Sequence, residues 1–435
     1  MTLRLLVAAL ALGLSATVFA ETPSIEALAA PLDAKVQSWR RDFHQHPELG
    51  NRETRTAGIV AAHLRALGLE VRTGIAHTGV VGILRGGLPG PNIGLRADMD
   101  ALPVTERGDL PFASKATAEY AGQTVGVMHA CGHDSHTAML MGVAEALAGM
   151  RKQLPGAVMF IFQPAEEGPP AGEEGGARLM LDEGLFKDFK PEAVFGQHVI
   201  AGIPSDSIHY RPGPFMAASD SFRIVVKGSQ THGSTPWRGV DPVVASAAII
   251  GSAQTVVSRE AELIKGPLVV SFGTIRGGVR YNIIPDQVEL TGTIRSFDPA
   301  MRTQAHENLR RVAENVAAAH KASVETHIPE QEGAPVLRND PALVAAMLAS
   351  LERAAPGKVK EVAPVTTAED FAYYSEAAPV FFWFVGATAP DADMAKVPFN
   401  HSPDFVLDEA ALKLGVRTML QVALDRLAMP AATIP

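Results

Sequence analysis

Apolar residues recur along this chain in short continuous runs that are flanked by Pro and Gly. These runs predict strands buried on both faces of a largely parallel sheet, at residues 80–84, 93–97, 158–162, 194–196 and 380–385. Residues 24–68 carry the pattern of two helices, and the second helix is expected to end at Gly68. The alternation of helices and strands predicts an α/β domain with a mostly parallel sheet between helices.

The pattern changes in residues 216–331. Phe222, Ile224 and Val226 alternate with polar residues and predict a strand. The following segments predict a helix at 241–260, strands at 268–275 and 288–295, a helix at 299–322 and a strand at 324–328. This βαββαβ order is the ferredoxin-like plan. Because the α/β pattern resumes near Pro335, we expect an inserted domain within a discontinuous catalytic domain formed by residues 21–215 and 332–435.

The first twenty residues have the pattern of a cleavable signal peptide. Arg4 precedes an apolar run at residues 5–14, and small residues at 18–20 precede Glu21. The alternative, an uncleaved anchor, is disfavoured because the apolar run is too short to span a bilayer. We therefore expect a secreted protein, periplasmic if the source is a Gram-negative bacterium.

The composition narrows the classes of partner. The chain has 435 residues, of which 47% are hydrophobic and 20% charged, and its formal net charge is -9. It contains no cluster rich in Lys and Arg. These features predict a globular protein with a sizeable core and argue against nucleic acid or an anionic membrane as its partner.

Cys131 is the only cysteine, so it cannot form a disulfide within the chain. It lies two residues from His133, and Asp134 follows directly. A thiolate and an imidazole at this spacing can reach one metal ion, and a neighbouring carboxylate can orient the imidazole. A buried free thiol without a chemical role is the alternative.

Acidic and histidine residues follow three of the predicted strands. Asp98 and Asp100 end the strand at 93–97, the Glu166-Glu167 pair follows the strand at 158–162, and His198 follows the strand at 194–196. Ligands bind at the carboxyl ends of strands in open α/β sheets, so we expect these groups to converge on one cleft. Gathered carboxylates repel one another unless cations hold them, which favours a metal site over solvated loops.

The Glu166-Glu167 pair suits metal-assisted hydrolysis. Adjacent residues in extended backbone point in opposite directions, so one carboxylate can bind a metal while the other faces a metal-activated water. The second carboxylate would take the proton of the water and then protonate the departing amine. The sequence has no G-x-S-x-G, H-E-x-x-H or P-loop motif that would support competing chemistry.

Four further residues are candidates for the site, and for each the alternative is a solvated surface position. His401 lies in a Pro-bounded loop after the strand at 380–385, and His232 lies in a turn after the first strand of the inserted unit. Asn282 and Arg295 could hold a substrate carboxylate, Arg295 through a bidentate fork. Taken singly, each residue is more often a solvated side chain.

Several motifs occur in a fixed order from residue 41 to the last predicted helix. They are LRADMDALP at 95–103, HACGHDSH at 129–136, QPAEEG at 163–168, HGS at 232–234, EDF at 369–371 and NHSP at 400–403. Together they resemble the dinuclear-metal aminoacylase/carboxypeptidase family. The resemblance is to its branch of hippurate hydrolases, N-acyl-amino-acid amidohydrolases and plant auxin-conjugate hydrolases.

This resemblance implies a ligand set for two divalent metal ions, with Cys131 as the bridge. The implied ligands are Cys131, His133, Glu167, His198 and His401. It further implies Glu166 as the general base and later acid, and Asp100 as the residue that orients a ligand, with His129 close by.

For the inserted unit, the resemblance implies a lid and dimerisation domain. His232 would reach the active site of the partner subunit and stabilise the oxyanion there. Asn282 and Arg295 would hold the free carboxylate of the substrate.

We therefore predict a metal-dependent amidohydrolase that cleaves N-acyl or N-aroyl amino acids. Its two ions would be Zn, Mn, Co or Ni, because mixed thiolate, imidazole and carboxylate ligands suit all four. We expect a homodimer or a higher homo-oligomer. A carboxypeptidase or dipeptidase of the same family is the first alternative, and a catalytically inactive periplasmic binding or scaffold protein is the second.

Overall fold

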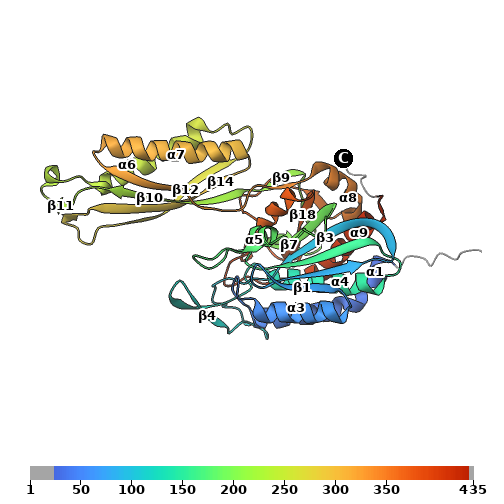
Figure 1. Cartoon of the computed structure of the whole chain (residues 1–435). Helices are drawn as coiled ribbons and strands as arrows, with labels where there is room; N and C mark the ends of the chain where they lie inside the picture. Colours follow the sequence, from blue (N-terminus) through green and yellow to red (C-terminus); the bar gives the residue numbers. More distant parts are fainter. Residues whose placement is uncertain (1–23, 431–435) are drawn as a thin grey trace, which may run out of the picture.

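The computed structural model describes residues 24–430 and shows a larger unit from which a smaller unit projects (Figure 1). The predicted signal peptide at residues 1–20 lies outside the described residues. Among the helices of residues 24–430, none has the length and apolar character needed to cross a membrane.

The larger unit is built on an eight-stranded sheet in the order β1-β2-β6-β3-β7-β18-β8-β17. Its strands are β1 (Glu70–Ile75), β2 (Gly79–Arg85), β3 (Leu88–Asp98), β6 (Pro155–Gln163), β7 (Ala193–Pro204), β8 (Ile208–Tyr210), β17 (Val359–Glu361) and β18 (Val380–Thr388). The four central strands β6, β3, β7 and β18 are parallel. At one side, β2 pairs antiparallel with β6 and β1 pairs antiparallel with β2. At the other side, β8 pairs antiparallel with β18. The predicted mixed, mostly parallel sheet is confirmed.

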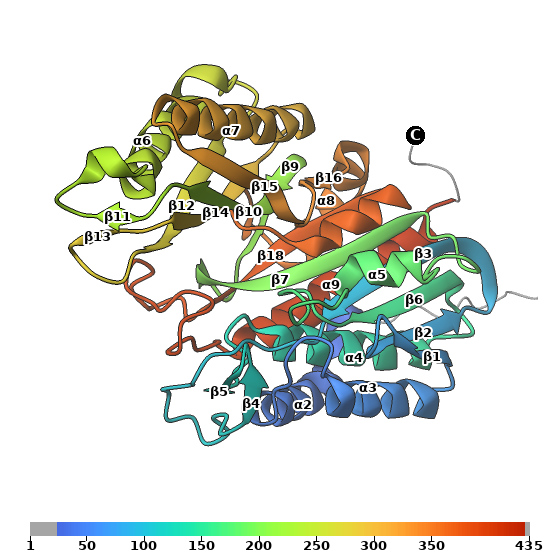
Figure 2. The same cartoon turned by 60° about the vertical axis from the view of Figure 1, so that its left-hand side comes forward.

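Helices cover both faces of this sheet (Figure 2). One face packs against α1 (Ile25–Ala29), η1 (Ala30–Leu32), α2 (Asp33–Gln45), α3 (Thr54–Ala66), α4 (His133–Gly149), α8 (Pro341–Ala354) and α9 (Ala410–Ala428). The other face packs against α5 (Gly176–Asp182) and η4 (Asp370–Glu376). Along β6, Phe160 and Phe162 belong to the first core, while Met159 and Ile161 belong to the second. The prediction of strands buried on both faces is therefore confirmed.

The inserted unit has the predicted βαββαβ order. Its elements are β10 (Ala218–Lys227), α6 (Pro242–Thr255), β12 (Leu268–Gly277), β14 (Gln287–Ser296), α7 (Pro299–Ala319) and β15 (Ser323–Glu332). The strands form an antiparallel sheet in the order β12-β14-β10-β15, and α6 and α7 share one apolar core with it. Both helices begin with an Asp-Pro pair, in which Asp241 or Asp298 accepts the first free backbone N–H groups and Pro occupies the first turn.

Smaller elements complete the chain. They are β4 (Thr117–Tyr120), β5 (Gln123–Gly126), β9 (Gly213–Met216), β11 (Thr231–His232), η2 (Pro236–Arg238), η3 (Val256–Glu260), β13 (Ile283–Ile284) and β16 (Leu337–Asn339). Strands β9 and β16 pair with each other where the chain leaves and re-enters the larger unit, so the two connections lie side by side. The domain boundaries at residues 215, 216, 331 and 332 stay predictions.

Candidate metal centre and active site

The Cys131-Gly132-His133 turn has a glycine in the left-handed conformation at its centre. Gly132 has φ 96° and caps the N-terminus of α4, so Cys131 lies just before the helix and His133 in its first turn. A Cβ on Gly132 would lie under 3.0 Å from Val199 Cγ2. Only glycine combines a positive φ with the absence of a Cβ. The turn at Gly132 therefore brings the thiol and the imidazole to one place.

The five predicted ligands gather around the sulfur of Cys131. Two groups of donor atoms share this sulfur, and in each group all atoms lie within 4.8 Å of one another: His133 and His198 in the first, Glu167 and His401 in the second. The sulfur lies 3.3 Å from Nε2 of His198 and 3.3 Å from Nε2 of His401. One sulfur shared by two donor groups is the arrangement that two bridged ions require.

The free donor atoms of these residues fit a metal. His133 Nδ1 is held by Asp100 Oδ1 at 3.1 Å, and His198 Nδ1 is held by the carbonyl of Val199 at 2.6 Å. In both rings Nε2 therefore remains for an ion, as in most histidine ligands. His133 Nε2 is buried and makes no hydrogen bond. Such an orphaned polar atom is costly unless a ligand satisfies it.

His136 lies nearby but does not fit a metal. Its Nδ1 bonds Asp98 Oδ1 at 2.6 Å, and its Nε2 accepts the Val199 N–H at 2.8 Å. Both ring nitrogens are thus used within the protein. The group formed by Asp98, His133 and His136 is therefore a hydrogen-bonded support of the site rather than a third ion position.

The site is electrostatically prepared for cations. Burial lowers the pKa of His133, but the charges of Asp98 and Asp100 outweigh burial and raise it to about 10. Burial and the carboxylates of Glu167 and Glu166 raise the pKa of the Cys131 thiol well above its ordinary value. In the absence of ions the centre holds protons, and ions would displace these protons when they bind.

Glu166 is placed to act as the base. Its Oε2 lies 3.9 Å from His133 Nε2, and its neighbour Glu167 points toward His401, with 3.0 Å between Oε1 and Nε2. Burial and the carboxylates of Glu369 and Glu167 raise the pKa of Glu166 well above its ordinary value. The two carboxylates lie on a turn rather than on extended backbone, and each has an oxygen 3.9 Å from His133 Nε2, so their separate roles stay a prediction.

Three supporting residues were not among the predicted site residues. Glu53 is buried, and its carboxylate accepts the Ala165 N–H at 2.9 Å and the Thr78 hydroxyl at 2.5 Å. Ala165 has φ 49°, a strained value for a residue with a Cβ, so Glu53 holds the turn that presents Glu166. The helix-capping position of Glu53 gives no sign of this role in the sequence.

Arg96 and Asn400 are the other two. Arg96 is fully buried and bonds Asp98 at 2.6 Å and Glu369 at 2.9 Å, so it compensates part of the acidic charge beside Glu166. Asn400 donates to the carbonyl of Cys131 at 2.9 Å and so ties the His401 loop to the thiol turn. Both residues stand inside the quoted motifs, which is the signal that could have revealed them.

His129 is buried against the centre without a partner. Neither of its ring nitrogens makes a hydrogen bond, and burial lowers its pKa to about 4. It therefore contributes a neutral imidazole and no charge.

The three predicted residues of the inserted unit belong to none of the donor groups of the ligand cluster. His232 is part of the β11–β13 pair at the end of the inserted unit and Asn282 directly precedes β13, and the Gly233 N–H donates to the Asn282 carbonyl (Figures 1 and 2). Arg295 lies on β14, is half-buried, and donates to the Ser219 hydroxyl. Their roles toward the substrate stay predictions.

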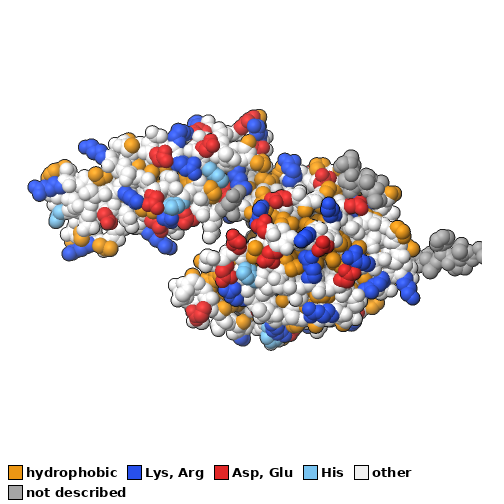
Figure 3. Space-filling model, viewed as in Figure 1, with side chains coloured by type: hydrophobic (Ala, Val, Ile, Leu, Met, Phe, Trp, Pro, Cys, Tyr) orange, Lys and Arg blue, Asp and Glu red, His pale blue; other side chains and the backbone are white. Residues whose placement is uncertain are grey.

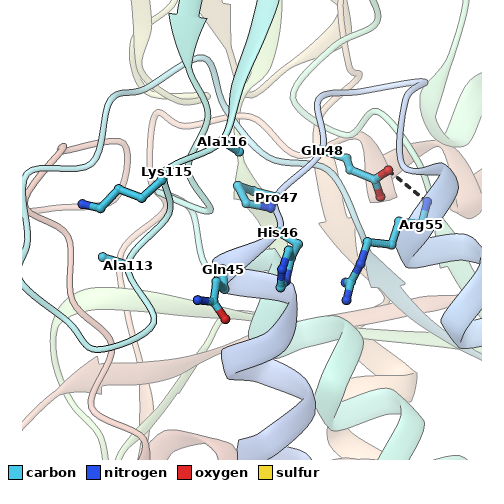
Figure 4. A pocket seen from close by; sticks show the side chains of 8 residues that line it. All are labelled: Gln45, His46, Pro47, Glu48, Arg55, Ala113, Lys115 and Ala116. Carbon is cyan, nitrogen blue, oxygen red and sulfur yellow. Dashed lines mark hydrogen bonds between the residues drawn. The ribbon is translucent and has the colours of Figure 1, made fainter.

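A separate hollow of about 470 Å³ lies beside the end of α2 (Figure 4). Two of its polar residues are paired: Glu48 accepts the Arg55 N–H at 2.9 Å, and the Arg55 side chain bonds both oxygens of Asp42 at 2.9 Å. Predicted site residues do not line it, and it takes no part in the site.

Comparisons with known proteins identify the family of the chain. Residues 94–425 match the model of the Peptidase family M20/M25/M40. Thermostable carboxypeptidase 2 of Saccharolobus solfataricus is 39% identical over 88% of this chain and 93% of that protein. N-acetyl-L-cysteine deacetylase of Bacillus subtilis is 37% identical over 88% of this chain and 85% of that protein.

The similarity extends to the fold of a solved structure. The YxeP protein of Bacillus subtilis, described as a dinuclear metal binding peptidase from the M20 family, is 34% identical with a TM-score of 0.73. The match covers 92% of this chain and 99% of that one. The chain therefore belongs to the peptidase family M20/M25/M40 and is a metal-dependent hydrolase that acts on amides.

Proposed function

We propose that the protein cleaves the amide bond of N-acyl or N-aroyl amino acids, using two divalent ions held by Cys131, His133, Glu167, His198 and His401. The observation that carries this proposal is the position of Glu166. Its carboxylate lies beside the two donor groups that share the sulfur of Cys131 and belongs to neither of them, although it forms a further donor group with His133 and Glu167. The deacetylase among the relatives supports an N-acyl amino acid as the substrate.

The reaction follows from these positions. Bound divalent ions supply Lewis acidity, which activates water and polarises an amide carbonyl. Glu166 takes a proton from the attacking water as the new C–O bond forms. It then delivers this proton to the nitrogen as the C–N bond breaks, so that a free acid and an amino acid leave. Asp100 keeps the imidazole of His133 in the ligating tautomer throughout.

The test is a substrate panel on the purified protein with and without a chelator. Hippurate-type amides, N-acetyl amino acids and dipeptides are compared side by side, and Glu166→Ala is the matched variant. We expect chelator-sensitive hydrolysis of acyl amino acids, no turnover by Glu166→Ala, and an unchanged metal content in that variant. Turnover by Glu166→Ala would remove Glu166 from the role of base.

A carboxypeptidase or dipeptidase is the second candidate function. The relative from Saccharolobus solfataricus favours it, because that protein is named a carboxypeptidase and is 39% identical. The same panel separates the two candidates: a carboxypeptidase cleaves peptides faster than acyl amino acids. A protein that binds these compounds without hydrolysing any, with or without metal, would be the inactive binding protein instead.

We further propose a homodimer formed through the inserted unit. Most exposed large apolar side chains of the described residues lie in this unit: Trp237, Val243, Val244, Leu263, Ile264, Ile275, Val279 and Tyr281. Strand β12 is also an unpaired edge of the four-stranded sheet. On the face seen in Figure 3, acidic and basic side chains are interspersed over both units. Exposed apolar surface beside a free strand edge suits a second copy of the chain.

The dimer proposal gives His232 its role. His232 is exposed at the end of the inserted unit, and its Nδ1 accepts the Ser234 N–H at 3.0 Å, so Nε2 remains available to a substrate held by the partner subunit. Mixing Glu166→Ala with His232→Ala tests this arrangement. Hybrid dimers would contain one complete site and regain activity. If each variant is weak alone and the mixture gains nothing, His232 does not act across subunits.

Two smaller proposals complete the function. Asn282 and Arg295 would bind the substrate carboxylate, so Arg295→Ala should raise KM more than it lowers kcat. The protein would be exported and processed before Glu21, which N-terminal sequencing of the protein from a periplasmic fraction would check.

A further inference from the structure

The loop that carries Glu166 and Glu167 connects the end of β6 at Gln163 to the start of α5 at Gly176. It contains no regular helix or strand of its own. A base on such a loop works only if the loop is held, because small displacements of a reacting group are costly. Glu53 holds Ala165 from one side. The opposite side is held by a residue that the reaction does not otherwise use.

That residue is Asp370, at the start of η4. Its carboxylate accepts Gln163 Nε2 at 2.7 and 2.9 Å, at the point where the loop begins. The same carboxylate accepts the Ala177 N–H at 2.7 Å, at the point where the loop ends. One partly buried side chain from a distant part of the chain thus joins both ends of the loop.

The residues packed around Asp370 allow its carboxylate to reach the Ala177 N–H and hold it there. Gly176 has φ 68°, and a Cβ there would lie under 3.0 Å from Asp370 Oδ2, so the carboxylate can reach Ala177 only over a glycine. Arg96 donates to Asp370 Oδ1 at 3.1 Å and fixes the carboxylate from behind. The backbone N–H of Asp370 points at Glu166 Oε1, 3.4 Å away.

We propose that Asp370 is a positioning residue for the base: it clamps both ends of the loop and directs the Glu166 carboxylate toward the ions. This inference rests on the proposed function of Glu166. A simpler role, as a counter-charge of Arg96, does not account for the geometry. Arg96 already bonds Asp98 and Glu369, and neither of these carboxylates accepts a hydrogen bond from the Gln163 side chain or the Ala177 N–H, as Asp370 does.

Two variants test the clamp from opposite sides. Asp370→Asn replaces one acceptor oxygen by an NH₂ group, which must face either Arg96 or the Ala177 N–H. Gly176→Ala leaves all charges unchanged and pushes the carboxylate away. Gly357→Ala is the matched control, because Gly357 also has a positive φ of 69° and a Cβ there would meet nothing within 4 Å.

The expected result is a fall in kcat without a loss of metal. A displacement of about 1 Å costs about 10²-fold in rate, so we expect kcat to fall about 10- to 100-fold in both variants, with KM and the count of bound ions unchanged. Gly357→Ala should keep wild-type kcat. The double variant should lose less than the product of the two single losses, because both changes break one contact.

Hydrogen exchange gives a readout that does not depend on activity. The Ala177 amide should exchange faster in Asp370→Ala, which removes both acceptor oxygens, while the Ala165 amide, held by Glu53, should exchange at the wild-type rate. If the wild type hydrolyses no amide, the proposed function fails, yet the exchange rates still decide whether the clamp exists. Wild-type kcat in both variants, loss of ions, or an unchanged Ala177 amide would each overturn the proposal.

Discussion

The Gly132→Ala substitution probes the turn on which the whole centre is built. Gly132 has φ 96°, and a left-handed conformation costs a residue with a Cβ about 1–2 kcal/mol. The added Cβ would also lie under 3.0 Å from Val199 Cγ2 inside the core, and overpacking of this kind costs about 1–3 kcal/mol. The two costs act on the folded state together, so we expect a loss of about 2–5 kcal/mol in the free energy of unfolding.

A matched control separates the two costs. Gly122, between β4 and β5, also has a positive φ of 75°, but a Cβ there would meet nothing within 4 Å. Gly122→Ala should therefore lose only the backbone cost of about 1–2 kcal/mol. Urea unfolding of the two chelator-treated variants measures the difference, which isolates the overlap with Val199.

The same variant should also lose its ions. Relief of the overlap moves Cys131 relative to His133, and both are needed in the first group of donors. Titration with Co²⁺, followed by the absorption of the cobalt–thiolate bond, measures this loss. The reasoning is refuted if Gly132→Ala unfolds at the same urea concentration as Gly122→Ala and takes up cobalt like the wild type.

Three further predictions follow from the contacts of the centre. Asp100→Asn weakens the support of His133 and of the Glu167 N–H, and metal affinity should fall about 10- to 100-fold in a competition titration. The metal-free protein keeps a proton on His133 up to its pKa of about 10, so metal affinity should rise with pH through the neutral range, by about tenfold per pH unit for each proton released. Calorimetry in two buffers of different ionisation enthalpy counts these protons, and a pH-independent affinity would contradict the assignment. Glu53→Ala frees the strained Ala165 and should lower kcat strongly, whereas Glu53→Gln keeps an acceptor oxygen and should recover part of the rate; equal rates would argue against the support role.

The apolar pattern of the sequence predicted the central strands correctly. The predictions of strand ends and edge strands failed where functional or exposed residues interrupt this pattern. The strand predicted at 194–196 was expected to end before Gln197-His198, but β7 continues to Pro204 because its pairing with β18 continues past these polar residues. This boundary was wrong because His198 is buried for its chemistry rather than for its hydrophobicity. Strand β1 was missed because it lies at the sheet edge, where an exposed face carries no alternation that a sequence pattern could detect.

The site was predictable where spacing carries the chemistry. Cys131 and His133 are close in sequence, His198 lies on β7, and Glu166 follows β6, a strand parallel to β7, so local pattern and topology bring them together. The contact of Glu53 with Ala165 joins residues 112 positions apart, and that of Asp370 with Ala177 joins residues 193 apart. Such pairings depend on tertiary packing, and a single sequence gives no pattern for them.

The balance of buried charge indicates how the centre behaves without metal. Arg96 compensates Asp98 and Glu369, but Asp100 and Glu167 face His133 instead. A buried carboxylate needs a positive partner, and in the metal-free chain the raised pKa of His133 makes its imidazolium that partner. Binding of an ion then exchanges one positive charge for another rather than creating the site. We therefore expect the chelated protein to keep its near-UV circular dichroism and to regain full activity on re-addition of metal, whereas unfolding on chelation would show that the ions, and not the proton, hold these carboxylates together.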